Sequence, residues 1–101
     1  APEQVRILSL SNENVPYARE VLKHVREGKI RASLDESSEK LGAKIRRSEL
    51  EKIPYMFIIG NQEQVDRKVS LRSRKDKSIE GIHGIACAID LISKEIEEKR
   101  L

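Results

Sequence analysis

One short segment, Tyr55–Ile59 (YMFII), constrains the fold of this chain more than any other. Its residues are apolar at both odd and even positions, so a strand made from it has no face to offer to water. A strand of this kind is typical of the centre of a sheet that helices cover on both faces. Pro54 before it and Gly60 with Asn61 after it set the ends of the strand.

Strand-like and helix-like segments alternate along the rest of the chain. Strands are expected at Gln4–Leu10, Ile30–Leu34 and Lys68–Arg74, with a very short one near Ser78–Glu80. Helices are expected at 15–28, from about 38 to 52, and at 82–96. Helical crossovers connect parallel strands, whereas the two successive strands that begin at Tyr55 and Lys68 can pair antiparallel. The order predicts an α/β fold of three layers, in which a mixed, mostly parallel sheet of four to five strands carries three helices on its faces.

The length of 101 residues suits one domain, expected to span 1–101, and is too short for two. The chain begins Ala1-Pro2 without a methionine, which suggests a domain excised from a longer polypeptide. The longest apolar run, at Ile53–Ile59, is far too short to cross a membrane, so no membrane partner is expected. One cysteine and two histidines predict neither a disulfide framework nor a metal site.

The motifs of phosphate binding and nucleophilic catalysis are missing. Neither GxGxxG nor GxxxxGK[ST] follows the first strand, and no serine lies in a nucleophile elbow. Cys87 lies in the apolar stretch IACAID, where a small buried side chain is expected. His24 and His83 are interpreted as surface or turn residues. We therefore expect no catalytic residue in this chain.

Positive charge is concentrated in the middle of the chain. Residues 38–78 carry eleven basic and six acidic side chains, whereas residues 1–37 carry six of each and residues 79–101 carry three and five. A local cationic zone on a nearly neutral domain suits a loop of RNA better than a DNA duplex, so DNA is not an expected partner. The alternative is a solvated surface that is merely rich in lysine.

Several sequence blocks in the same region suggest a family. The stretch 35–60 reads DESSEKLGAKIRRSELEKIPYMFIIG, and KVSLRSR follows at 68–74. Together with APEQV at the start, these blocks resemble the carboxy-terminal anticodon-binding domain of bacterial-type threonyl-tRNA synthetases. Prolyl, histidyl and glycyl synthetases share that fold but typically replace the G-x-K-I-R and I-P-Y-M blocks. The resemblance implies a mixed sheet of about five strands with three helices.

The resemblance also implies a function. The partner would be the anticodon loop of a threonine tRNA, with G and U at its second and third positions, held in position for a separate catalytic domain. ATP, magnesium and zinc would belong to that catalytic domain of the parent enzyme, with no cofactor in this domain. The parent would be cytoplasmic and a homodimer through its catalytic domain.

Two residues match the anticodon-reading carboxylate and arginine of the family: Glu63, just after the central strand, and Arg72, on the outward face of the next strand. An arginine can donate to O6 and N7 of guanine, and a carboxylate can accept from its N1 and N2 hydrogens. The expectation is that both residues grip one guanine from two sides. The alternative is that Arg72 is a solvated residue or a partner of Glu63 without contact to RNA.

A basic ridge is expected on the second helix. Lys40, Lys44 and Arg47 cluster on the helical wheel, opposite Leu41 and Ile45. The resemblance assigns Lys40 and Lys44 to phosphate or base contacts. The alternative is a helix laced with salt bridges, because Glu51 lies on the same ridge. Arg46 projects toward the apolar arc, where we expect it to be partly buried and paired.

Further RNA contacts and two departures complete the expectations. Arg74, Lys75 and Lys77 extend the cationic edge in an electrostatic role. Ser38 stands where the family usually has asparagine, and Gln62 where a lysine is common. If position 38 contacts the final U, serine offers only one short hydroxyl for it. These departures favour the alternative of a non-catalytic accessory or regulatory domain that kept the fold for protein interaction.

Overall fold

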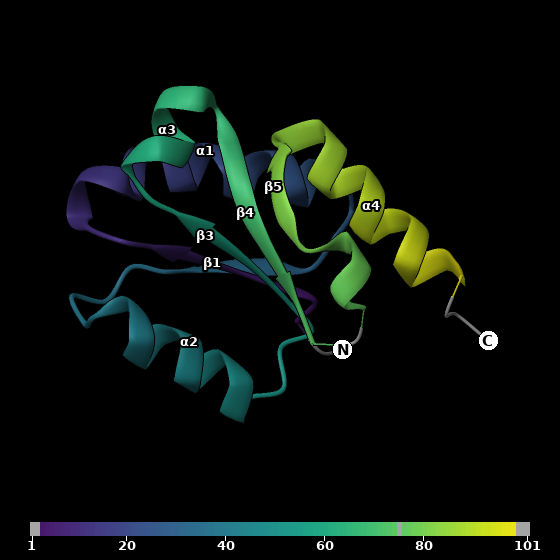
Figure 1. The fold of residues 1–101 in the computed structure, drawn as a ribbon, viewed down its shortest axis with the longest axis horizontal. Helices are drawn as coiled ribbons and strands as arrows, with labels where there is room; N and C mark the ends of the chain where they lie inside the picture. Colours follow the sequence, from purple (N-terminus) through teal and green to yellow (C-terminus); the bar gives the residue numbers. More distant parts are fainter. Residues whose placement is uncertain (1–2, 75, 99–101) are drawn as a thin grey trace.

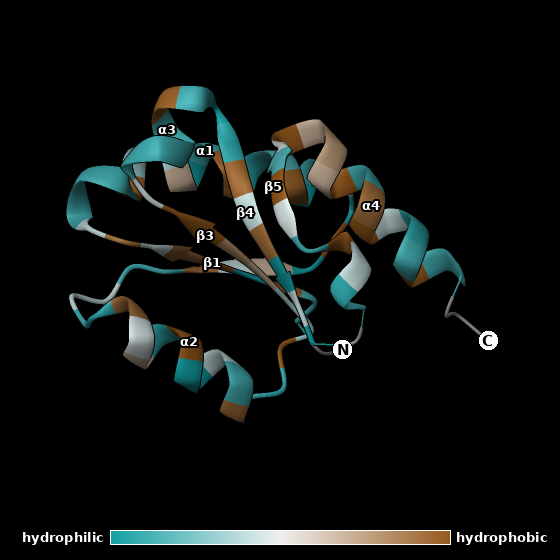
Figure 2. Ribbon diagram, in the orientation of Figure 1, coloured by the Kyte–Doolittle hydropathy of each residue, from teal (hydrophilic) through white to brown (hydrophobic). Residues whose placement is uncertain are grey.

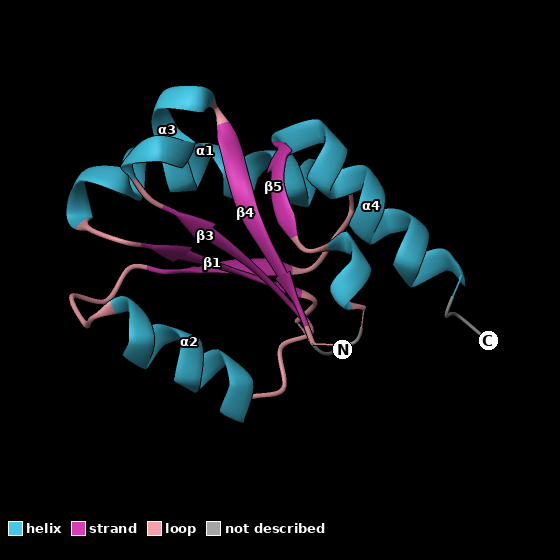
Figure 3. Ribbon diagram, in the orientation of Figure 1, coloured by secondary structure: helices cyan, strands magenta, loops and turns pink. Residues whose placement is uncertain are grey.

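The apolar segment Tyr55–Ile59 forms strand β3, in the centre of a five-stranded sheet, as its sequence predicts. The computed structural model describes residues 3–74 and 76–98, so Lys75 lies outside the described residues. Within them, Figure 3 shows strands and helices alternating along most of the chain. The other strands are β1 (Val5–Ser9), β2 (Ala32–Asp35), β4 (Lys68–Ser73) and β5 (Gly81–Gly84). The α-helices are α1 (Val15–Glu27), α2 (Leu41–Leu50), α3 (Asn61–Asp66) and α4 (Ile85–Glu98).

The sheet is mixed, with the strand order β2-β1-β3-β4-β5. Strand β1 runs parallel to both β2 and β3, whereas β4 runs antiparallel to β3 and to β5. The predicted α/β class and the antiparallel pairing of β3 with β4 are therefore confirmed. In the register, Ile7 lies beside Phe57 and Phe57 lies beside Leu71, which places these three side chains on one face of the sheet.

Helices cover both faces, so the predicted three layers are confirmed. Figure 1 shows α2 alone on one side of the sheet, with α1 and α4 on the other. The short helix α3, which the sequence did not predict, follows the carboxyl end of β3. The face toward α1 and α4 will be called the α1 face, and the opposite one the α2 face.

The main hydrophobic core lies between the sheet and the α1 face helices. Phe57 and Ile7 are fully buried there against Val21 of α1 and Ile92 of α4. Figure 2 shows hydrophobic residues gathered along β3 and on α4. Full burial of a side chain of this size stabilises the fold by roughly 1.5–3 kcal/mol. The core therefore fixes the positions of the strand ends that carry the candidate site.

The α2 face is held by fewer apolar contacts. Leu8, Ile53 and Met56 are buried but do not belong to the main core cluster. The buried residues of α2 itself are polar, namely Lys44 and Ser48. Helix α2 therefore packs on the sheet through a polar seam.

Three predictions about the carboxyl-terminal part need correction. A 3₁₀ helix (Lys77–Ile79) occupies the site of the predicted short strand, and the strand β5 comes after it. The last helix begins at Ile85 because Ile82, whose spacing fits the helical stripe, lies on β5 opposite Ser70. Cys87 is exposed and not buried, since the inner side of α4 is formed by Ala88 and Ile92 and Cys87 lies outside it.

Candidate nucleic-acid interface

A hollow of about 300 Å³ lies where β1 and β2 end, between the β1–α1 loop and the start of α2. The residues that line it are Leu10, Ser11, Asn12, Ser37, Ser38, Glu39, Lys40 and Lys44. In α/β sheets, ligands bind outside the carboxyl ends of parallel strands, which is where this hollow opens. The structure thus brings together three of the predicted RNA contacts, Ser38, Lys40 and Lys44.

Lys40 lies at the entrance of this hollow, just before the first turn of α2. Its side chain is exposed, as is that of Ser38 two residues earlier. The acidic neighbour Glu39 forms an ion pair with Arg47, which offsets its negative charge. The rim of the hollow therefore presents an accessible ammonium group and an accessible hydroxyl group.

Lys44 does not lie on an exposed ridge, so the predicted Lys40–Lys44–Arg47 ridge is wrong. Only 2% of Lys44 is exposed, and its Nζ donates to the backbone oxygen of Ser9 over 2.9 Å. The aliphatic stem of a lysine can pack like an apolar side chain while its ammonium group reaches a polar partner. Lys44 thus forms the floor of the hollow and fixes α2 to the end of β1.

Arg46 and Arg47 of α2 have the opposite of their predicted positions, since Arg46 was expected to be partly buried and Arg47 to be exposed. Arg46 is exposed, whereas Arg47 is half-buried and donates to Asp35 at the end of β2 over 2.8 Å. Burial alone would raise the pKa of Asp35. The hydrogen bonds from Ser37 and the charges of Arg47 and Lys44 instead hold that pKa below its usual value. The carboxylate of Asp35 is therefore part of the attachment of α2.

Glu63 lies after the carboxyl end of β3, on helix α3, and is not part of the lining of the hollow. Its Oε1 accepts the N–H of Gly60 over 2.7 Å, which turns the chain from β3 into α3. A Cβ atom added to Gly60 would lie 2.9 Å from Glu63 Oε1 and 3.2 Å from Leu10 Cδ2. Leu10 lines the hollow, so Glu63 lies near one residue of the lining without belonging to it.

Arg72 and Glu63 make no described contact with each other, and the expected grip of both residues on one guanine stays a prediction. Arg72 pairs with Met56, which lies four positions before Gly60 in the chain. Along the sheet, the level of Arg72 is therefore roughly 13 Å from that of Gly60. Arg72 lies on the α2 face, where it is exposed. Glu63 is partly exposed, so both side chains are accessible to a partner.

Arg74 lies further still from the hollow. Its N–H donates to the backbone oxygen of Pro54, at the amino end of β3. Arg74 is exposed, and so is Lys77 after it. The cationic residues of β4 and its following loop thus extend away from the hollow along the sheet.

Sequence reasoning missed the residues that shape the hollow from the β1–α1 loop. Leu10 is 52% exposed although it is a large apolar residue, and Ser11 and Asn12 form the wall beside it. The sequence signal for this surface is the polar pair Ser11-Asn12 directly after the first strand. Asn14, in contrast, is fully buried and joins this loop to α3.

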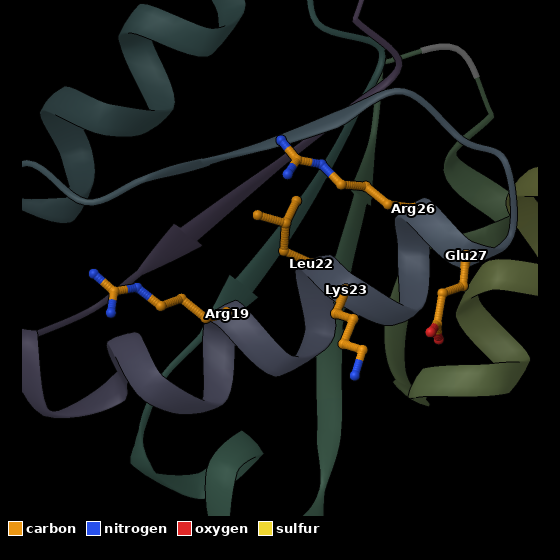
Figure 4. A pocket seen from close by; sticks show the side chains of 5 residues that line it. All are labelled: Arg19, Leu22, Lys23, Arg26 and Glu27. Carbon is orange, nitrogen blue, oxygen red and sulfur yellow. The ribbon is translucent and has the colours of Figure 1, made fainter.

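A second hollow of about 370 Å³ follows the outer side of α1 (Figure 4). It is lined by three cations, Arg19, Lys23 and Arg26, with Leu22 and Glu27. Arg26 extends toward β2 and donates to the backbone oxygen of Ala32, while Arg19 pairs with Glu36. Because two of its three cations are engaged, this hollow is the weaker candidate for an anion.

Among residues 3–74 and 76–98, no three histidine, cysteine, aspartate or glutamate side chains gather as a possible metal site. In the same described part of the chain, no helix has the length and apolar character that a membrane crossing requires.

Comparison with known proteins places the chain in a family. Residues 4–98 match the family described as "Anticodon binding domain". A threonine–tRNA ligase from Caldanaerobacter subterraneus subsp. tengcongensis is 46% identical over the whole of this chain, which spans 16% of that ligase. The chain therefore covers about one sixth of the length of such a relative.

Solved structures agree with this result. The RNA binding domain of threonyl-tRNA synthetase from Cryptosporidium parvum Iowa II superposes with a TM-score of 0.85 at 34% identity, over 93% of this chain and 24% of that one. Histidyl-tRNA synthetase from Nostoc sp. PCC 7120 shares the fold, with a TM-score of 0.86 at 20% identity, over 95% of this chain and 23% of that one. The match across nearly the whole chain shows that this protein belongs to the anticodon-binding domain family.

Proposed function

We propose that this chain is the anticodon-binding domain of a threonyl-tRNA ligase and that it recognises the anticodon loop of threonine tRNA. The observation that carries the proposal is the 46% identity to a threonine–tRNA ligase over all 101 residues. The cationic hollow at the ends of β1 and β2 supports it, because an unpaired loop can turn a base out of its stack into such a site.

The hollow suits a uracil base. Uracil has an N3 hydrogen to donate and carbonyl oxygens that accept. The hydroxyl of Ser38 can accept the first or donate to the second. Leu10, in the lining of the hollow, offers an apolar surface to the base. We assign the final U of the anticodon to this place.

Arg72 suits the guanine that precedes this U. Its guanidinium can donate to O6 and N7 together, a contact that contributes about 1–3 kcal/mol of discrimination. The carboxylate of Glu63 can accept the N1 and N2 hydrogens of the same guanine. The loop would therefore pass from the hollow onto the exposed strand β4.

Cations around these two places would position the loop without reading its sequence. Lys40 would contact a phosphate at the entrance of the hollow, and Lys44 would add positive charge from its floor. Arg74 would act over a longer range from the far end of β4. Such contacts make affinity strongly dependent on salt.

The ligation chemistry, with ATP, magnesium and zinc, would belong to a separate catalytic domain of a cytoplasmic, homodimeric parent enzyme. The proposal assigns only binding and positioning of tRNA to the 101 residues. It is supported by the small share of the relative that the chain covers, 16%.

The test is a titration of the 101-residue chain with three stem-loops: the threonine anticodon loop, one with the middle G changed to A, and one with the final U changed to C. We expect each change to weaken binding by at least about fivefold, the lower end of one specific base contact. Equal and weak binding of all three loops would contradict the proposal. That result would support an accessory domain that has kept only the fold.

A further inference from the structure

The α2 face of the sheet is open over β4 and β5 in the described part of the chain. Helix α2 is attached at the other end of the strand order, through Lys44 to β1 and through Arg47 to β2. Figure 1 shows α2 under β1 and away from β5. On β4, Lys68 and Arg72 point to this face and are both exposed. This part of the sheet is therefore accessible to a partner, and its charge suits an anionic one.

One row of side chains crosses the open surface. In the register, Ser70 of β4 lies opposite Ile58 of β3 on one side and opposite Ile82 of β5 on the other. Directly opposite residues of antiparallel strands point to the same face. Val69 and Leu71 point into the core, so Ser70 and its two partners lie on the α2 face. Ile58, Ser70 and Ile82 will be called the Ser70 row.

The Ser70 row is apolar at its ends and small at its centre. Ile82 is 58% exposed, and Ile58 and Ser70 are half-buried. A single exposed apolar side chain is normal on a protein surface. Here, however, two isoleucines flank a smaller serine across three strands. A flat group can lie over Ser70 with an isoleucine side chain on either side of it.

Arg72 lies on one side of the Ser70 row. It follows Ser70 by two residues on β4, so the two side chains point to the same face roughly 6–7 Å apart. Glu80, the acidic group within electrostatic reach of Arg72, accepts the N–H of Ser73 over 2.9 Å and pairs with Lys77. Among residues 3–74 and 76–98, Arg72 itself forms no ion pair. Its exposed guanidinium is therefore available to a ligand.

The carboxylate of Glu63 lies on the other side of the row. Gly60 continues the alternation of Met56 and Ile58 along β3, so a Cβ atom at Gly60 would point to the α2 face. That atom would lie 2.9 Å from Glu63 Oε1. The carboxylate is therefore on the α2 face, at the level of Gly60 and two residues beyond Ile58.

The Ser70 row thus lies midway between the two groups that match the guanine readers of the family. It divides the roughly 13 Å between the levels of Arg72 and Gly60 into two equal steps. A guanine that lies flat over Ser70 presents its O6 and N7 to Arg72, and its N1 and N2 hydrogens to Glu63. The three aromatic residues of the chain are all buried, so no ring is available to stack on this base.

We propose that Ile58, Ser70 and Ile82 form the surface on which the middle guanine of the anticodon lies. The inference rests on the proposed function, which assigns this guanine to Arg72 and Glu63. Those two groups select the base by its edges, whereas the Ser70 row supports its face. Support of a face adds affinity without selecting a base, because every base has a π-face. The height of the base above Ser70 sets its alignment with the two reading groups.

The first test is the variant Ile82→Ala, which removes most of one exposed isoleucine. Its binding is measured with the threonine stem-loop, with the loop that has A in place of the middle G, and with a loop whose middle nucleotide has no base. The G loop and the A loop should each bind at least about fivefold more weakly, the lower end of the loss for one supported base. Their affinity ratio should stay within about twofold of that of the unmodified chain.

The loop without the middle base decides which nucleotide Ile82 supports. Low salt keeps its binding measurable, because phosphate contacts are then strongest. Ile82→Ala should change the affinity for this loop by less than about twofold, since the base that Ile82 would support is missing. A loss as large as with the G loop would show that Ile82 contacts another part of the RNA, and would overturn the proposal.

Ser70→Leu tests the height of the base. A larger side chain at the centre of the row lifts the base out of line with Arg72 and Glu63, so the G-to-A affinity ratio should fall by at least about fivefold. The side chain of Ser70 makes no described hydrogen bond and leucine is tolerated on a half-exposed strand, so circular dichroism should show an unchanged fold. An unchanged ratio would overturn the placement over Ser70.

Two matched controls are apolar side chains that are at least as exposed but lie away from the row. Leu50→Ala on α2 and Val65→Ala on α3 remove side chains that are 73% and 77% exposed. Both variants should bind all three loops within about twofold of the unmodified chain. A loss in Leu50→Ala equal to that in Ile82→Ala would mean that exposed apolar surface of any kind aids binding, and would contradict the proposal.

The outcomes separate this inference from the proposed function. If the unmodified chain does not prefer the G loop to the A loop, the proposed function fails. If it prefers the G loop, and Ile82→Ala and Ser70→Leu bind both loops as the unmodified chain does, only the present proposal fails.

Nuclear magnetic resonance of the complex gives a direct readout. With isotope-labelled methyl groups, Ile82 should show nuclear Overhauser contacts to the H8 proton of the middle guanine, whereas Leu50 should show none to that base. Contacts from Ile82 to other nucleotides alone would overturn the proposal.

Discussion

The Nζ atom of Lys44 lies 2.9 Å from the backbone oxygen of Ser9, in the buried seam between α2 and the end of β1. This contact joins the second helix to the strand whose end forms the candidate hollow. Lys44, which the resemblance assigns to RNA contact, therefore also stabilises the fold. The distinction between buried and exposed lysines leads to the first two predictions.

Lys44→Met should lower the free energy of unfolding by about 1–3 kcal/mol, because it leaves the buried carbonyl of Ser9 without its donor. Urea unfolding followed by circular dichroism measures this change. Ser9→Ala is the matched control, since it removes only the longer contact to the hydroxyl, at 3.4 Å, and keeps the carbonyl bond. A loss in Ser9→Ala as large as in Lys44→Met would refute this role of the lysine.

Lys40→Ala should weaken all anticodon stem-loops alike and leave the unfolding free energy within about 0.5 kcal/mol. The plot of log affinity against log salt should become shallower by about 0.7, the value for one phosphate contact to a single strand. Lys94→Ala on α4 removes the same charge from an exposed position in the other helical layer. Equal slopes for the two variants would mean that Lys40 contributes only net charge.

Arg72→Ala and Glu63→Gln should act on the same base. Because both side chains are proposed to contact the middle G, each change should reduce the preference for G over A at that position. In the double variant, the losses of binding free energy should not add. Binding assays with the G loop and the A loop measure these terms. Losses that add within about 0.5 kcal/mol would contradict the grip on one base.

Asp35 should make the attachment of α2 sensitive to acid. Its pKa is lower in the folded chain than its usual value near 4, so the folded state favours the ionised form. The resulting stability is present above about pH 4 and is lost as the pH falls through the lowered pKa. Asp35→Asn should therefore destabilise the chain at pH 7, and its unfolding free energy should approach that of the unmodified chain near pH 2.

The partner variant Arg47→Ala checks the cause of this acid sensitivity. Removal of the guanidinium should bring the pKa of Asp35 closer to its usual value, so the acid limb of the stability curve becomes flatter. Urea unfolding at a series of pH values measures both variants. An acid limb unchanged by Arg47→Ala would show that the ion pair does not contribute.

The sequence predicts some features well because their causes are local. The two-sided apolar run at Tyr55–Ile59 requires a covered central strand, and the alternation at 68–73 requires a half-exposed neighbour. The order of strands and helices is compatible with few topologies, so the mixed sheet between two helical layers could be predicted. The structure confirms it. The motif blocks identify the family because they extend over most of the chain.

The orientation of α2 is different, because its ten residues carry apolar and basic side chains on adjoining sides. The rule that apolar residues face inward predicts Leu41 and Ile45 inside and Lys44 outside. The sheet offers a backbone oxygen at that point, and a long lysine satisfies it while its stem packs. The choice between Arg46 and Arg47 as the buried arginine follows from this rotation and from Asp35.

The chain by itself determined the strand at its centre, the mixed sheet and the family, since periodicity and contiguous motifs are properties of neighbouring residues. Only the tertiary structure decided the rotation of α2 and the placement of α3. These depend on contacts such as that of Asn14 with Asn61 and Gln64, which join residues 47 and 50 positions apart. No local pattern encodes such contacts, because each arises where separate elements meet and a buried polar group must find a partner.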